Sequence, residues 1–173
     1  MDRFTRKLVD AIDAISEFVG LTISWLSLAM MVVTCIIVAS RYIFNLGSIA
    51  LQETVVYMHG IVFMLGIAYT LKHQGHVRVD IFYGEFSVRK RALVDLIGAL
   101  IFLLPVGLFL FFSSLNYVSF AWSLGESSAQ PGGLPGVYLL KTLIPLMAFL
   151  LVLQGIAEIG RAGIVLFLYT ENS

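Results

Sequence analysis

Four long apolar runs constrain the fold of this chain more than any other feature of its sequence. They lie at about 19–40, 54–71, 96–117 and 137–159. Each approaches or exceeds the roughly 20 residues that a helix needs to cross a hydrocarbon core about 30 Å thick. A soluble domain has about a quarter of its residues charged, whereas here 13% are charged and 59% are hydrophobic. The sequence predicts an all-α integral membrane protein with four transmembrane helices, forming a single membrane domain over 1–173.

The charge balance and the single cysteine exclude several classes of function. The formal net charge is zero, so nothing indicates a nucleic-acid partner. Cys35 is the only cysteine. An intrachain disulfide, a dithiol redox site and a thiolate metal cluster are therefore excluded.

Lysine and arginine are distributed unevenly between the predicted connections. Nine of the 11 lie before the first run, between the second and third runs, or after the fourth run. Only Arg41 and Lys141 lie at the other two connections. The positive-inside rule then predicts that the N and C termini and the connection between the second and third runs are cytoplasmic.

Both ends of the chain are expected to lie in the cytoplasmic interface of the membrane. Residues 1–18 combine an apolar and a charged face, which is typical of an amphipathic interfacial helix. A simple helical extension of the first span fits the same pattern. After the fourth run the chain is expected to bend and form an interfacial tail over 160–173. The apolar residues of the first segment are Phe4, Leu8, Ala11, Ile12 and Ile15.

Two prolines lie inside the predicted spans. Pro105 and Pro145 lack the N–H group that would bond to the carbonyl four residues earlier. A kink is therefore expected in the third and in the fourth helix.

The two outer connections carry few charges. Arg41 and Glu53 bracket the first, where they could form an ion pair that lowers the cost of charges near hydrocarbon, or extend separately to water. In the second, Glu126 is the only charge before Lys141, and glycines and prolines including Pro135 break the helical pattern. This predicts a shaped surface for protein contact, although an exposed connector remains an alternative.

The polar stretch "KHQGHVRVDIFY" (72–83) separates the second and third runs. His73, His76 and Asp80 could in principle bind zinc, but no fourth ligand of a suitable type is nearby in the sequence. A hydrogen-bonded and charge-paired cluster involving Arg78 and Asp80, packed on a partner, is the preferred interpretation.

His59 is the only histidine inside a span. A haem held between two axial histidines is therefore not supported, and we expect a helix-to-helix hydrogen bond or an outer contact. A proton relay is an open alternative. Since no nucleophile and base occur at a diagnostic spacing, no catalytic residue, metal or cofactor is expected.

Three stretches resemble a known family. They are "SRYIFNLGSIALQETVVYMHGIVFMLGIAYTLKHQGHVRVDIFY" (40–83), "SLGESSAQPGGLPGVYLLKTLIP" (123–145) and "LLVLQGIAE" (150–158). Together they resemble the DctQ-like small membrane subunit of tripartite ATP-independent periplasmic (TRAP) transporters. The resemblance covers nearly the whole chain.

The resemblance implies a non-catalytic scaffold in the bacterial inner membrane with both termini cytoplasmic. Its implied partners, besides the lipid bilayer, are a large membrane subunit (DctM-like) and a periplasmic substrate-binding protein (DctP-like). The large subunit would move a small organic acid by an elevator motion coupled to sodium. Together with His59, the matched positions give the candidate interface or structural residues: Arg41, Glu53, His59, His76, Arg78, Asp80, Glu126, Pro135 and Lys141.

Two alternatives from other classes remain. One is a haem-free membrane anchor of a respiratory or redox complex, and the other is a small transporter that works alone. The anchor is taken as haem-free because a span supplies only one histidine, and the lack of a haem site argues against this alternative. The lack of a mid-span acid in the first helix argues against the small transporter.

Overall fold

The computed structural model describes residues 3–76 and 83–171, and the elements within those residues are helical. Four stretches are long and apolar enough to cross a membrane, and α4, η1 and α5 together form one of them. The predicted all-α fold with four transmembrane helices is therefore confirmed. The elements are α1 (Arg3–Ile43), α2 (Ile49–Lys72), α4 (Val88–Gly98), the π-helical turn η1 (Ala99–Leu103), α5 (Leu104–Leu124) and α6 (Val137–Glu171).

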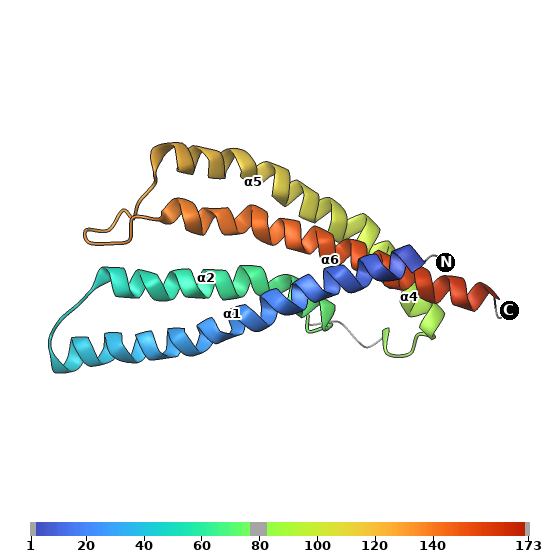
Figure 1. Cartoon of the computed structure of the whole chain (residues 1–173), viewed down its shortest axis with the longest axis horizontal. Helices are drawn as coiled ribbons and strands as arrows, with labels where there is room; N and C mark the ends of the chain where they lie inside the picture. Colours follow the sequence, from blue (N-terminus) through green and yellow to red (C-terminus); the bar gives the residue numbers. More distant parts are fainter. Residues whose placement is uncertain (1–2, 77–82, 172–173) are drawn as a thin grey trace.

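The helices form two hairpins that meet at α6 (Figure 1). α1 packs on α2, and α5 packs on α6. α6 also contacts α1, α2 and α4, so it lies between α5 and the α1–α2 hairpin. The start of α1 and the end of α6 lie together at what we call the terminal end. The α1–α2 and α5–α6 connections lie at the opposite end, the turn end.

The buried core is built largely from small side chains. Ala68, Ala121, Ala148 and Ala157 have no exposed surface, whereas Phe63 is 68% exposed. In lipid, helices associate through close packing rather than through burial of large apolar groups, and small residues allow their backbones to approach. The large apolar side chains are therefore free to face lipid or another protein.

Two glycines mark the closest helix contacts. A Cβ atom at Gly20 of α1 would lie 2.8 Å from Cβ of Tyr69 on α2. A Cβ atom at Gly107 of α5 would lie 2.8 Å from Cγ2 of Val152 on α6. Each hairpin thus depends on a position where no side chain fits.

α1 is one helix of 41 residues, so the segment before the first span extends that span without a break. At 1.5 Å per residue it is about 60 Å long, twice a hydrocarbon core of about 30 Å. Val9 and Ile12 of the extension pack against Ala157 of α6, while Phe4 and Leu8 stay exposed. A place for these exposed side chains in the membrane interface remains a prediction.

α6 also continues beyond its predicted span. It runs from Val137 to Glu171 with Pro145 inside it, and the bend expected after residue 159 does not interrupt the helix. Arg161 and Ala162 explain the difference, because Arg161 bonds to α1 and Ala162 is buried. These contacts hold the first turn beyond the predicted span against α1.

The irregularity expected at Pro105 takes the form of a π turn. Leu104 donates its N–H to the carbonyl of Ala99, five residues earlier, at the end of η1. Pro105 follows directly and has no N–H to donate. The wider turn therefore joins α4 to α5 while keeping the chain helical across the span.

Candidate functional site

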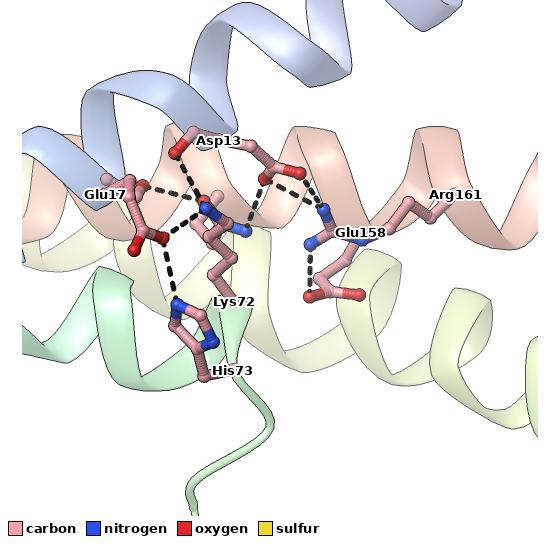
Figure 2. Close-up of polar contacts among 8 residues, drawn as sticks. Asp13, Glu17, Lys72, His73, Glu158 and Arg161 are labelled. Atoms are coloured by element: carbon pink, nitrogen blue, oxygen red, sulfur yellow. Dashed lines mark hydrogen bonds and ion pairs between the residues drawn. The ribbon is translucent and has the colours of Figure 1, made fainter.

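A group of charged and polar side chains joins α1, α2 and α6 near the terminal end (Figure 2). We call it the terminal cluster. Because its members come from three helices, it fixes the position of both hairpins relative to each other. Its members are Asp13, Ser16, Glu17, Lys72, His73, Gln154, Glu158 and Arg161.

Arg161 of α6 is the centre of one half of the terminal cluster. Its Nη1 donates to both carboxylate oxygens of Asp13 on α1, at 2.8 and 2.6 Å. Its Nη2 donates to Oε1 of Glu158 at 2.7 Å. The planar guanidinium group can satisfy two carboxylates at once, which lysine cannot do with the same geometry.

Gln154 extends this half into the core. Its side chain is fully buried, and its Oε1 accepts a hydrogen bond from Ser16 Oγ at 2.8 Å. Its Nε2 donates to Oδ1 of Asp13 at 3.2 Å. Both ends of the carboxamide are therefore bonded to α1, as a buried amide requires.

Glu17 is the centre of the other half, where α2 ends. Its Oε2 lies 2.5 Å from Nζ of Lys72 and 2.9 Å from Nε2 of His73. Lys72 also donates to the backbone carbonyl of Asp13 at 3.2 Å. The first two residues of the polar stretch 72–83 are thus held by α1.

The spacing of these residues explains how the cluster forms. Asp13, Ser16 and Glu17 are three and four residues apart, so they share one face of α1. Gln154, Glu158 and Arg161 have the same relation on α6. Three carboxylates therefore lie among two permanent cations and a histidine, which limits the cost of holding charge near the helix core.

A second contact joins the hairpins at the turn end. Glu53 of α2 accepts hydrogen bonds from Ser128 Oγ and, at 2.6 Å, from the N–H of Leu134. We call this the outer clasp. A Cβ atom at Gly133 would lie 2.8 Å from Oε1 of Glu53, so the connection between α5 and α6 needs glycine there.

Lys141 and Glu126 form an ion pair within the second hairpin. Nζ of Lys141 lies 2.5 Å from Oε2 of Glu126 and 4.2 Å from the centroid of the Tyr117 ring. Beside it, Trp122 Nε1 donates to Thr142 Oγ1 at 2.9 Å. These contacts brace the end of α5 against the start of α6.

Of the two alternatives for Arg41 and Glu53, the ion pair between them does not form. The carboxylate of Glu53 points to the α5–α6 connection instead. Arg41 is exposed and forms no ion pair within residues 3–76 and 83–171. Two residues that bracket a short loop need not face each other, because each lies on a helix with its own facing direction.

The histidines have different surroundings. His59 is exposed on α2 and stacks on Phe63, with ring centroids 6.1 Å apart, so the structure assigns it no bond to another helix. His76 is exposed, while Arg78 and Asp80 lie outside the described residues. Across the part of the chain that the structure describes, no three or more His, Cys, Asp or Glu residues form a group that could hold a metal.

Pro135 is exposed in the α5–α6 connection, directly after the residue bound by Glu53. Its contribution to a protein interface stays a prediction.

Sequence reasoning did not identify the residues of the terminal cluster that lie on α1 and α2. Asp13 and Glu17 were assigned only to a charged helix face, and Lys72 only to a loop. The available signal was a serine between these two acids, matched by a glutamine, an acid and an arginine at helical spacing on α6. Such facing polar stripes predict helix pairing.

Comparison with known proteins gives the family. The model of the DctQ component of tripartite ATP-independent periplasmic transporters matches residues 30–162. No curated protein and no solved structure matches the chain. The family match and the four apolar helices together indicate a multi-pass protein of the inner membrane. The chain therefore belongs to the DctQ family, as the small subunit of a TRAP transporter.

Proposed function

We propose that this chain is the scaffold subunit of a TRAP-type secondary transporter. It supports a large elevator-type permease subunit during sodium-coupled uptake of a small organic acid that a periplasmic binding protein delivers. The observation that carries the proposal is the family match over 30–162, which includes all of α2 and α5 and parts of α1 and α6.

The contacts of the ionisable groups support a bracing role. Asp13, Glu17 and Arg161 are bonded to other helices of the same chain, and Lys141 is bonded to Glu126. The contact between Asp13 and Arg161 resists relative motion of the two hairpins, and the other contacts brace each hairpin internally. A rigid support is what a moving neighbour requires.

The outward surface supports contact with another membrane protein. Large apolar side chains on α1, α2 and α5 face outward, among them Trp25, Phe63 and Phe109, each at least 68% exposed. Exposed apolar surface of this kind suits both lipid and a neighbouring transmembrane helix. The large subunit is proposed to cover part of it.

Both termini are proposed to be cytoplasmic. The start of α1 and the end of α6 lie at the same end of the molecule (Figure 1), and nine of the 11 cations belong to the two terminal segments and the one connection assigned to that side. The outer clasp would then face the periplasm, where a binding protein docks.

Purification in mild detergent tests the proposal. The tagged chain, extracted from its native membrane, is expected to retain a large polytopic permease, identified by mass spectrometry. Co-reconstitution of the two subunits with the binding protein should give solute uptake that requires an inward sodium gradient. The chain alone in the same vesicles should give none.

Two outcomes would contradict the proposal in different ways. Recovery of a cytoplasmic oxidoreductase in place of a permease would favour the membrane-anchor alternative. Sodium-driven uptake by the chain alone would favour the self-sufficient transporter. Uptake by the complete system without a sodium gradient would refute the ion coupling and leave the scaffold role standing.

A further inference from the structure

Two adjoining cavities lie where α1 ends and α2 begins. The larger, about 590 Å³, is lined about equally by polar and apolar surface, and its polar side chains include Arg41, Asn45 and Gln52. The smaller, about 200 Å³, is lined more by apolar side chains, including Ile37 and Leu51. Arg41, Gly47, Ser48 and Gln52 line both cavities. The cavity richer in polar groups thus adjoins a mainly apolar one, and the two share the Arg41 side chain.

The charge of this place favours an anion. Neither cavity has an acidic residue in its lining, and the nearest one in sequence, Glu53, is bonded to Ser128 and Leu134 on the other hairpin. Arg41 makes no ion pair with any described residue. A guanidinium group without a carboxylate partner suits bidentate contact with a phosphate group.

The position of the cavities favours a lipid as the source of that phosphate. Arg41 lies in the last turn of a membrane-spanning helix. The chain beside it exposes apolar and aromatic side chains, with Tyr42 79%, Ile43 71% and Phe44 66% exposed. Aromatic residues at the end of a span are typical of the depth of lipid headgroups.

We propose that Arg41 and the two cavities bind one glycerophospholipid. The phosphodiester lies against the Arg41 guanidinium in the polar cavity, with Asn45, Ser48 and Gln52 as neutral hydrogen-bonding neighbours. An acyl chain enters the apolar cavity beside Ile37 and Leu51. This site is independent of the terminal cluster and of the outer clasp.

Native mass spectrometry of the full chain tests the site. The chain is delipidated in mild detergent and titrated with dioleoylphosphatidylglycerol. We expect the first lipid molecule to bind more tightly than any further one. Arg41→Gln should weaken binding of this first molecule about tenfold or more, because the substitution removes a charge-assisted contact. Arg89→Gln, at an exposed position in α4, is the matched control and should bind like the unmodified chain.

Further arms separate the sources of the anion. Arg41→Lys keeps the charge but loses the bidentate hydrogen-bonding geometry of the guanidinium group. This variant should therefore bind the lipid with intermediate strength, and it gives a result even if Arg41→Gln folds poorly. Leu51→Ser should weaken lipid binding without affecting inorganic phosphate. Displacement of the lipid by millimolar inorganic phosphate would overturn the lipid assignment in favour of a free anion.

Two other results would overturn the proposal entirely. One is equal lipid binding by the unmodified chain and by Arg41→Gln. The other is an Arg41→Gln chain that loses its protein partner during purification while its lipid content is unchanged, since a protein carboxylate would then be the ligand.

Discussion

Removal of Arg161 would leave two carboxylates of the terminal cluster without their cation. It neutralises Asp13 on α1 and Glu158 on its own helix, and these two carboxylates have side chains only 22% and 16% exposed. Asp13 is in a different position, because its loss leaves Arg161 still paired with Glu158. The two halves of one ion pair are therefore not equivalent.

We predict that Arg161→Ala destabilises the chain more than Asp13→Ala. The expected costs are about 2–3 kcal/mol for Arg161→Ala and about 1–2 kcal/mol for Asp13→Ala, since two carboxylates without their cation cost more than one buried Gln154 N–H without its acceptor. The thermal unfolding midpoint of the purified chain in detergent measures both. Arg89→Ala at the exposed start of α4 is the control, and equal midpoints for the two variants would contradict the ordering.

Gln154 and Ser16 give a second prediction at this scale. Gln154→Leu keeps the volume of a fully buried side chain but removes the hydrogen bonds to Ser16 and Asp13. A double-mutant cycle with Ser16→Ala should give a coupling energy of about 0.6–1.7 kcal/mol, the range for hydrogen bonds between membrane helices. Gln130→Leu, in the exposed α5–α6 connection, should have no effect. A coupling energy of zero would mean that the hydrogen bond is absent in the membrane protein.

Pairing of individual residues was only partly predictable from the sequence. Gln154, Glu158 and Arg161 were recognisable as one face of a helix, because the spacing of 3.6 residues per turn fixes that relation. Their partners were not predictable, since the local sequence does not determine which helix packs on this face of α6. The partner of Glu53 was not predictable for the same reason. Ser128 is 75 residues away in the sequence, whereas Arg41, the partner considered from the sequence, is near.

At the scale of elements, close approach between helices depends on missing side chains. Gly20 lies against the ring of Tyr69 where α1 crosses α2, and an added Cβ atom would lie 2.8 Å from Cβ of Tyr69. Gly98 at the end of α4 has no neighbour within 4 Å of such an atom. Alanine substitutions at these two glycines therefore distinguish the effect of helix packing from the effect of helix propensity.

We predict that Gly20→Ala lowers stability by about 1–3 kcal/mol, because overpacking forces the helices apart. Gly98→Ala should be neutral or raise stability by up to about 1 kcal/mol, since alanine favours the helix. Unfolding midpoints in detergent compare the two variants. An unchanged midpoint for Gly20→Ala would show that α1 and α2 do not approach as closely as described.

The existence of the four spans was predictable, and their lengths were not. Apolar runs of bilayer length leave the backbone no alternative to a helix in lipid. The extension before the first span is charged enough to be taken for a separate segment, yet Asp13 of that extension forms an ion pair with Arg161 beyond the fourth span. The π turn before Pro105 was likewise invisible, because a proline predicts a disturbance without its form.

On the scale of the whole molecule, the two hairpins are tied at both ends. The terminal cluster joins α1 to α6 and also to α2, and the outer clasp joins α2 to the α5–α6 connection. Between these ties, the contact of the two hairpins runs along α6 (Figure 1). Loss of one tie should therefore loosen one end while the other keeps the hairpins together.

The outer clasp gives the prediction at this scale. Glu53→Ala removes the acceptor of both the Ser128 hydroxyl and the Leu134 N–H, so the α5–α6 connection should detach from α2. Spin labels at the exposed positions Phe44→Cys and Gln130→Cys, in a Cys35→Ser background, report the distance between the hairpins at the turn end. We expect a narrow distance distribution with Glu53 and a broad one with Glu53→Ala.

Glu126→Ala separates this effect from a general loss of order in the connection. Glu126 pairs with Lys141 inside the second hairpin, so its loss should leave the distance between hairpins narrow. If Glu126→Ala broadens the distribution as much as Glu53→Ala, the clasp is not what joins the hairpins. If only Glu53→Ala broadens the distribution, a single carboxylate on α2 sets the separation of the two hairpins at the turn end. That separation determines the surface that a partner bound at the turn end would contact.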